Sequence, residues 1–179
     1  TRIESQAVCD LCTGSGCIAI ALAKNFEYAD ITATDISDPA LAVAAENIEK
    51  YNLGKRIKLL RGDLFDPLIP YLDRGKFDLI VSNPPYVSTS EYQSLAQNIK
   101  GYEPSDALLA GEDGLDIYRR IAEKIDQFLN PGAAVMLEIG YSQGPAVTGL
   151  LEDTGVFSKS SIEKDFNDND RVVIASKSE

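Results

Sequence analysis

The sequence of 179 residues contains no histidine. Without imidazole, the chain has no Ser-His-Asp triad, no histidine general base and no histidine metal ligand. Long hydrophobic runs are also missing, because no apolar stretch approaches the length that spans a membrane and no signal peptide opens the chain. We therefore expect no membrane partner and no reaction that depends on imidazole.

Cysteine is scarce, and its three residues gather near the start, at Cys9, Cys12 and Cys17. So few cysteines suit a reducing compartment rather than a disulfide scaffold, which favours a cytoplasmic protein. Cys9 and Cys12 form a C-x-x-C pair, but a zinc site needs two further good ligands, and no histidine or other cysteine supplies them. We interpret the three as small residues around a strand end and predict no metal.

Positive charge is in short supply, with 17 lysines and arginines against 28 aspartates and glutamates and a net charge of −11. An acidic domain has no general attraction for nucleic acid phosphates. This balance argues against nucleic acid as the direct substrate, although a small basic patch within an acidic total would still allow one.

Methionine occurs once, at Met136, and the chain begins at Thr1. Thr1 is therefore not a translation start, and we expect either a processed protein or a domain of a longer one. The length suits a single domain with a sizeable core, so we treat residues 1–179 as one domain.

Among what is present, the most informative stretch runs from Phe77 to Tyr86. Its first half is apolar and rich in β-branched residues, which predicts a buried strand. Asn83 precedes a proline and is therefore extended, while Pro84 and Pro85 have fixed φ and no N–H, so the Pro84 carbonyl has little freedom. An amide and a bare carbonyl are thus held at the carboxyl end of a strand, where open α/β sheets bind ligands.

A second candidate site lies between an expected strand at residues 7–12 and an expected helix at 17–23. The turn between them reads Thr13-Gly14-Ser15-Gly16. Glycines let a ligand approach the backbone closely, and the helix N-terminus offers unpaired N–H groups to a carboxylate or phosphate. With Ala19 the turn also matches the dinucleotide pattern G-x-G-x-x-G/A, which by itself is a weak signal.

Acidic residues stand at the carboxyl ends of two further expected strands: Asp35 ends the strand at residues 31–35, and Asp63 directly follows the strand at residues 56–62. Asp35 can accept hydrogen bonds from both hydroxyls of a ribose. Its alternative role is a helix cap, but Ser37 or Asp38 is placed to cap the next helix, which should leave Asp35 free. Asp63 is expected beside the same crevice, unless it is only a turn residue.

The remaining pattern completes an α/β fold. Residues 89–112 are irregular and suit a lid or a substrate-binding segment. The other expected elements are a helix ending at Phe128 and stopped by residues 130–132, a strand at 133–139, a helix through 147–151, and strands at 156–164 and 171–176. The chain should form a doubly wound, seven-stranded, mostly parallel sheet with right-handed crossovers and a C-terminal antiparallel hairpin at its edge.

Two cofactors suit such a crevice. NAD fits the glycine turn and Asp35, but no proton relay is evident and the Asn-Pro-Pro-Tyr turn has no role in hydride transfer. S-adenosyl-L-methionine gives every feature a role: the glycine turn accommodates its methionine part, Asp35 takes the ribose, Asp63 and Leu64 flank the adenine, and Asn83 and the Pro84 carbonyl face the methyl group. We therefore predict this cofactor, with S-adenosyl-L-homocysteine as its product.

The two motifs Asp10-Leu11-Cys12-Thr13-Gly14-Ser15-Gly16 and Asn83-Pro84-Pro85-Tyr86 resemble those of class I methyltransferases that modify planar nitrogens. Within that class the chain is similar, over nearly its whole length, to the release-factor glutamine methyltransferases, often labelled HemK or PrmC. Further matching segments are Glu103-Pro104 with Ala107-Leu108, Asp113-Gly114-Leu115-Asp116 with Tyr118-Arg119, Leu137-Glu138-Ile139-Gly140, and the turn from Asp165 to Arg171.

The resemblance implies methyl transfer to the side-chain amide of the glutamine in the Gly-Gly-Gln motif of class I peptide chain release factors. The expected catalytic residues are Asn83, Pro84 and Tyr86, and these three with Pro85 are expected to bind the substrate. The residues expected to bind the cofactor are Asp10, Cys12, Thr13, Gly14, Ser15, Gly16, Asp35, Ile36, Asp63, Leu64 and Asn83. Two alternatives stay open: a nucleic-acid methyltransferase acting on an exocyclic base nitrogen, and a cofactor-binding module without turnover.

The chain departs from the family pattern in two places. The family usually has glycine where Cys12 stands, a change that a residue contacting ligand through its backbone would tolerate. The family also carries a helical N-terminal domain that helps dock the release factor, and that domain is missing from this sequence. Arg2-Ile3-Glu4-Ser5 resembles a family segment that a helix normally separates from the first strand.

Overall fold

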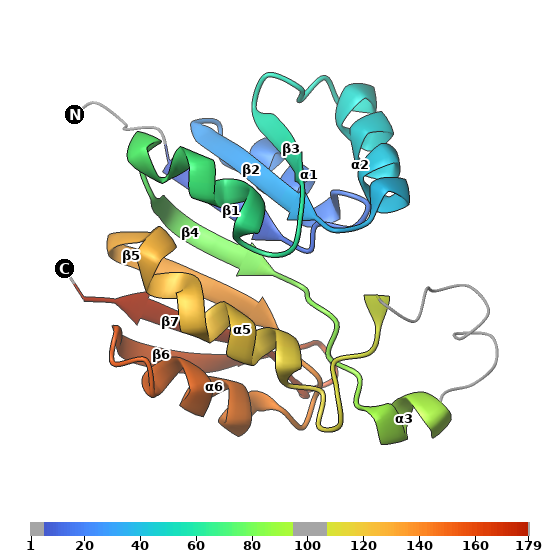
Figure 1. The fold of residues 1–179 in the computed structure, drawn as a ribbon, viewed down its shortest axis with the longest axis vertical. Coiled ribbons are helices and arrows are strands. Elements are labelled where there is room, and N and C mark those ends of the chain that lie inside the picture. The colour runs from blue at the N-terminus through green and yellow to red at the C-terminus, as the bar shows by residue number, and fades with distance from the viewer. Residues whose placement is uncertain (1–5, 95–106, 179) are drawn as a thin grey trace.

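The computed structural model of the protein describes residues 6–94 and 107–178. Within them, seven strands form one sheet (Figure 1). The strands are β1 (Gln6–Leu11), β2 (Ala29–Asp35), β3 (Ile57–Arg61), β4 (Phe77–Ser82), β5 (Leu129–Glu138), β6 (Phe157–Lys164) and β7 (Asp170–Lys177). The helices are α1 (Cys17–Asn25), α2 (Asp38–Lys50), the 3₁₀ helix η1 (Asp66–Arg74), α3 (Thr89–Ser94), α5 (Asp116–Lys124), the 3₁₀ turn η3 (Ile125–Phe128) and α6 (Gly144–Glu152).

The strand order is β3-β2-β1-β4-β5-β7-β6. β1 to β5 are mutually parallel, while β7 runs antiparallel to both β5 and β6. This arrangement confirms the predicted fold class and the closing hairpin at the sheet edge. The strand order changes sides between β1 and β4: β2 and β3 follow on one side of β1, and β4 and β5 follow on the other. The carboxyl ends of β1 and β4 therefore flank the crevice where such folds bind ligands.

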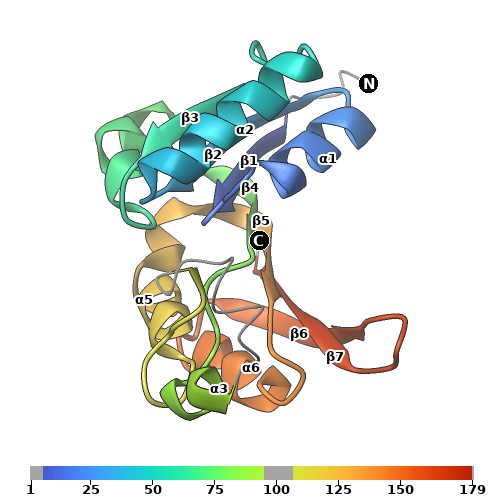
Figure 2. The same cartoon turned by 90° about the vertical axis from the view of Figure 1, so that its right-hand side faces the viewer.

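Helices cover both faces of the sheet (Figure 2). α1 and α2 pack on one face, where Val8, Ile20 and Ile48 belong to the smaller core. η1, α5 and α6 lie on the other face over the larger core, in which the rings of Phe65 and Phe128 stack with centroids 4.4 Å apart. β1 serves both cores because successive side chains of a strand point to opposite faces.

One expectation about local structure is wrong. Residues 130–132 do not end a helix before a strand at 133, because β5 already begins at Leu129. The ladder with β4 shifts between Phe77 and Leu79, which face Leu129 and Ala134, so the extra residues form a bulge that accommodates Pro131. The connection after β3 forms η1.

Among residues 6–94 and 107–178, no helix has the length and apolar character needed to cross a membrane. Over the same residues, no group of three or more cysteine, aspartate or glutamate side chains is arranged to hold a metal ion.

Candidate active site at the carboxyl ends of β1 to β4

The glycine turn lies between β1 and α1 and depends on three residues with positive φ: Cys12 at 57°, Gly14 at 57° and Gly16 at 82°. Thr13 closes it by accepting a hydrogen bond from the Gly16 N–H, 2.9 Å away. The left-handed region of backbone angles costs conformational energy for a residue with a Cβ, whereas glycine adopts it freely. This requirement explains physically why glycine suits the position of Cys12, which was expected to lie in the strand and instead begins the turn.

The Cys12 side chain is an inert thiol. Burial, together with the charge of Asp35, raises the pKa of Cys12 to about 12, so the sulfur stays protonated at neutral pH. A protonated thiol is a poor nucleophile and a poor metal ligand. Cys9 is fully buried in the larger core, and Cys17 is exposed at the start of α1.

Asp10 supports the turn from inside the protein. Its side chain is completely buried, and Oδ2 accepts hydrogen bonds from the Thr13 hydroxyl (2.6 Å) and the Ala19 N–H (3.1 Å). Its Oδ1 has no hydrogen-bond partner among the described residues. Desolvation raises the pKa of Asp10 to about 6, partly offset by these two hydrogen bonds. Asp10 therefore ties β1, the turn and α1 together and shapes the site without an exposed oxygen.

An Asp10→Asn variant should lose a pH dependence of stability that the wild type has. Because the folded-state pKa of about 6 lies above the ordinary 3.8, the folded protein holds the proton more tightly. The contribution of the protonated Asp10 carboxyl to the free energy of unfolding is thus full below about pH 4, and it is lost as the pH rises through 6. At about 1.4 kcal/mol per pKa unit, the variant should gain up to roughly 3 kcal/mol relative to wild type between pH 4 and pH 7. Urea unfolding across this range measures it, and a difference independent of pH would contradict it.

Asp35 ends β2 and is less free than expected. Its Oδ2 accepts the Gly14 N–H at 2.8 Å, and its Oδ1 accepts the Ser37 N–H at 2.9 Å. Of the two expected caps, Ser37 is the N-cap of α2: its hydroxyl accepts a hydrogen bond from the Ala40 N–H at 3.3 Å. The expectation that Asp35 would be unengaged is therefore wrong, but each carboxylate oxygen has a second lone pair left for a ribose hydroxyl. Ile36, the next residue, is 63% exposed.

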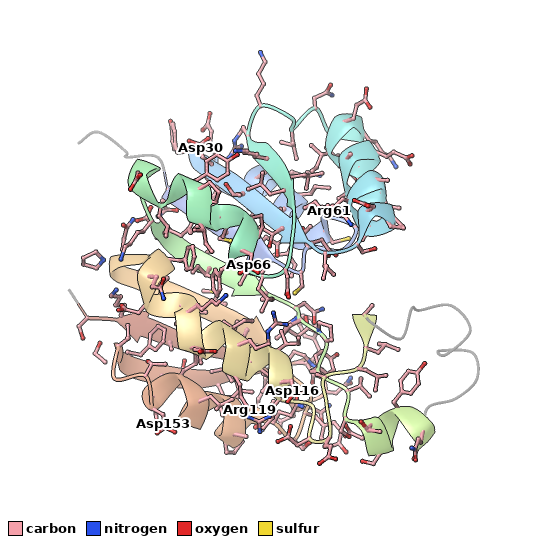
Figure 3. The ribbon with its side chains drawn as sticks, viewed as in Figure 1. Asp30, Arg61, Asp66, Asp116, Arg119 and Asp153 are labelled. Carbon is pink, nitrogen blue, oxygen red and sulfur yellow. The ribbon has the colours of Figure 1, made fainter. Side chains whose placement is uncertain are left out.

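Asp63 and Leu64 follow β3 and face the same edge. The Leu64 carbonyl accepts a hydrogen bond from the Thr34 hydroxyl at 3.1 Å, and its side chain is buried in the larger core, so Leu64 offers mainly backbone to the crevice. Asp63 forms an ion pair with Arg120 of α5 at 2.5 Å. Figure 3 shows Asp66, at the start of η1, on the side of α5, where Lys124 pairs with it at 3.0 Å. Asp63 is thus more than a turn residue, since it fastens β3 to α5.

The Asn-Pro-Pro-Tyr turn leaves the sheet beside the glycine turn. Leu11 lies opposite Ser82 in the β1–β4 ladder, and the Ser82 hydroxyl donates to the Leu11 carbonyl at 2.8 Å. Asn83 comes next and is exposed, whereas Pro84 is buried and Tyr86 is half-buried. The ladder therefore places Asn83 next to Cys12, at the same carboxyl ends of the strands that carry Asp35 and Asp63.

The segment after this turn folds back on itself. Val87 donates its N–H to Leu108 at 2.8 Å and accepts the N–H of Ala110 at 2.9 Å, and the Thr89 N–H donates to Gly111 at 2.9 Å. A cavity of about 520 Å³ adjoins the turn, lined by Tyr86, Ser90, Glu91, Tyr141, Gln143 and Arg171 among others. Glu103-Pro104, and much of the expected lid, lie outside the described residues.

Two residues of the site are absent from the sequence-based prediction. Arg120 pairs with Asp63, and Gln143, which precedes α6, hydrogen-bonds to Tyr86. Neither lies in a motif, and each meets its partner across 57 residues of chain. Only the packing of α5 and α6 against the sheet brings these pairs together.

Known proteins share both the sequence pattern and the fold. The chain is 43% identical over 171 residues to a release factor glutamine methyltransferase of Clostridium acetobutylicum, covering 95% of this chain and 59% of that protein. It is 48% identical over 140 residues to a ribosomal protein uL3 glutamine methyltransferase of Francisella tularensis, covering 78% of this chain and 43% of that one. The chain thus spans between two fifths and three fifths of these relatives' length.

Solved structures agree on the fold. A methyltransferase from Pyrococcus furiosus superposes with a TM-score of 0.69 at 20% identity, over 98% of this chain and 77% of that one. A ribosomal protein L11 methylase from Lactobacillus delbrueckii subsp. bulgaricus gives 0.66 at 24% identity, over 100% and 73%. Residues 1–101, which hold the glycine turn, the acidic strand ends and the Asn-Pro-Pro-Tyr turn, match the family described as "Methyltransferase small domain". With more than half of its length in that match, the chain belongs to the methyltransferase small domain family.

Proposed function

We propose that this domain transfers a methyl group from S-adenosyl-L-methionine to the side-chain amide nitrogen of a protein glutamine, namely the glutamine of the Gly-Gly-Gln motif in class I peptide chain release factors. The observation that carries the proposal is the position of Asn83 and Pro84, which leave β4 beside the glycine turn at the switch point of the sheet. The names of the relatives support protein glutamine as the methyl acceptor.

The residues at this edge fit the cofactor. A Cβ added at Gly14 would meet no atom within 4 Å, so the turn has room for a ligand over its backbone. Asp35 keeps acceptor capacity for ribose hydroxyls, and the exposed Ile36 offers an apolar surface to a base. When bound here, S-adenosyl-L-methionine would supply an electrophilic methyl group on a sulfonium, and Asn83 would be the residue that faces it.

The chain's own task is to orient the acceptor nitrogen. An amide nitrogen is nearly non-basic because its lone pair is delocalised into the carbonyl. The Asn83 side-chain oxygen and the Pro84 carbonyl can accept its two N–H groups, which aims the lone pair and stabilises positive charge as it develops on nitrogen. Orientation of this kind is worth on the order of 7–11 kcal/mol in favourable cases, so no titrating base is required. Tyr86 would pack against the planar amide, and Pro85 keeps the turn rigid.

At the glycine turn, two groups have raised pKa values, and neither is a base for the amide. Asp10 is buried beneath the glycine turn, where it meets no substrate, and the Cys12 thiol stays protonated. Neither is placed to remove a proton from an amide. The positive charge that forms on nitrogen is therefore stabilised first by the two acceptors, and the nitrogen loses its proton to water after the methyl transfer.

The expected partner is a class I release factor in the cytoplasm. The chain spans 59% of the length of the Clostridium relative, so a test with this domain alone leaves out any docking contacts that the rest of such a protein makes. We therefore expect a raised KM for the release factor and retention of the chemical step.

The proposal is tested by incubating the domain with methyl donor and, separately, with release factor, ribosomal protein uL3, tRNA, rRNA and DNA. Mass spectrometry then locates the added methyl group. The expected product is release factor methylated on the glutamine of Gly-Gly-Gln, and a release factor with alanine at that glutamine is the control. Methyl groups found on uL3 alone would make uL3 the substrate in place of the release factor. Methyl groups found on nucleic acid bases alone would rule out a protein as the methyl acceptor.

A further inference from the structure

We propose that Gln143 is a positioning residue that holds the Asn83–Tyr86 turn in its reactive geometry. The inference rests on the proposed function, since it concerns how the acceptor groups of that function are kept in place. Gln143 precedes α6, and its side chain is buried, with 9% of the residue exposed. It lies 57 residues from Tyr86 in the sequence, so the link between them is made by the fold.

The Gln143 amide joins three separate segments. Its Oε1 accepts the Gly140 N–H at 2.9 Å, which fixes the loop after β5. Its Nε2 donates to the Tyr86 carbonyl at 2.9 Å and to the Gly114 carbonyl at 3.2 Å, which fixes the exit of the catalytic turn and the loop before α5. Both N–H groups and one oxygen lone pair are thus used, and the amide orientation is defined because one end faces a donor and the other faces two acceptors.

Gly114 and Gly140 lie so close to the Gln143 amide that neither position has room for a Cβ. A Cβ at Gly114 would clash with the Tyr86 carbonyl oxygen and lie 2.7 Å from Gln143 Nε2. A Cβ at Gly140 would lie 2.9 Å from Gln143 Oε1. Both distances are shorter than carbon atoms tolerate, and Gly114 also has a φ of 76°. The two loops therefore approach closely enough for one amide to reach both and the turn.

The catalytic turn needs such an external hold. Pro84 and Pro85 have no N–H, so they contribute no backbone donor that could tie the turn to the rest of the fold. The start of the turn is fixed by a hydrogen bond that the Ser82 hydroxyl donates to the Leu11 carbonyl at 2.8 Å. At the exit, the peptide between Tyr86 and Val87 is held at both ends, because Gln143 donates to its carbonyl and its N–H donates to Leu108.

The consequence concerns the reaction more than the fold. If the Tyr86 carbonyl loses this donor, its peptide is still tied to Leu108 through the Val87 N–H, but it loses its link to Gln143 and, through it, to the Gly114 and Gly140 loops. The exit of the turn can then move, and the Tyr86 ring and the Pro84 carbonyl shift with it. A displacement of about 1 Å at a reacting group can cost around a hundredfold in rate. Cofactor binding should change little, because the glycine turn and Asp35 are held by their own hydrogen bonds.

Two variants test this role. Gln143→Glu keeps the shape and the acceptor for Gly140 but removes both donors, and Gln143→Met removes all three hydrogen bonds at similar volume. We expect kcat for release factor methylation to fall about ten- to a hundredfold in each. The Kd for S-adenosyl-L-homocysteine and the KM for release factor should stay within about twofold. Gln127→Met, at an exposed glutamine of η3, is the matched control and should leave all three constants unchanged.

Hydrogen exchange supplies a readout that does not depend on the substrate. The N–H groups of Val87, Ser88 and Thr89 are hydrogen-bonded in the wild type, to Leu108, the Glu91 carboxylate and Gly111. They should exchange faster in Gln143→Met, whereas peptides covering the glycine turn should not change. Unchanged exchange at these three residues overturns the inference, as does faster exchange with normal kcat. A uniform rise across the whole domain would mean a general structural role and also overturn it. A wild type that methylates no glutamine refutes the proposed function instead, and the exchange result still decides whether Gln143 holds the turn.

Discussion

The Asn83→Ala variant is expected to lose about a hundredfold or more in kcat while binding S-adenosyl-L-homocysteine nearly as well as the wild type. The reason is that an acceptor aimed at an amide N–H matters most when positive charge develops on the nitrogen, which happens only in the transition state. An interaction made only there changes kcat and kcat/KM together. Single-turnover methylation of release factor, with calorimetry for the ligand, separates the two effects.

The structure makes this variant easy to interpret. Asn83 is exposed at the end of β4, so removing its amide leaves no cavity in either core. The Ser82 bond to Leu11 keeps the entry of the turn in place, and the Pro84 carbonyl remains as the second acceptor because it belongs to the backbone. A matched control is Asn25→Ala, which removes an exposed asparagine at the far end of α1. A near-normal kcat in Asn83→Ala would mean that Asn83 is structural and that the mechanism above is wrong.

The fold and the location of the site could be predicted because both depend on local sequence patterns. A strand, a glycine turn and a helix can each be recognised within about ten residues, and parallel strands then place their carboxyl ends at one edge. The prediction of β5 failed because Asn130-Pro131-Gly132 is a typical helix stop, yet here it lies in a bulge. There the Asn130 side chain donates to Asp78 at 2.7 Å, a contact across 52 residues.

The side-chain network of the site could not be predicted for the same reason. Asp35 was expected to be unengaged, because the adjacent cap was assigned to Ser37 or Asp38, and the donor that reaches it is the backbone of Gly14, 21 residues earlier. Arg120 and Gln143 have no local pattern that marks them. Their roles follow from how α5 and α6 pack, which is decided by the larger core and not by any motif.

The Asp35→Ala variant is expected to bind S-adenosyl-L-homocysteine about five- to 150-fold more weakly, a loss of roughly 1–3 kcal/mol. Two effects add: the ribose hydroxyls lose a charged acceptor, and the Gly14 N–H loses the partner that holds the glycine turn. Asp35→Asn separates them, because its remaining oxygen can keep one backbone bond while the charge is lost. It should therefore bind more tightly than Asp35→Ala and less tightly than the wild type.

Asp30→Ala is the matched control, since Asp30 lies near the amino end of the same strand, whereas Asp35 lies at its carboxyl end, paired in the sheet with Arg61 of β3 (Figure 3). It should leave the affinity unchanged. Calorimetry with S-adenosyl-L-homocysteine and with NAD completes the test, because both ligands carry an adenosine ribose that an aspartate at this position could hold. Binding of the first and not of the second is expected, since the turn containing Asn83 has no role in hydride transfer. Heat with NAD and none with S-adenosyl-L-homocysteine would overturn the cofactor assignment and, with it, the role given to Asp35.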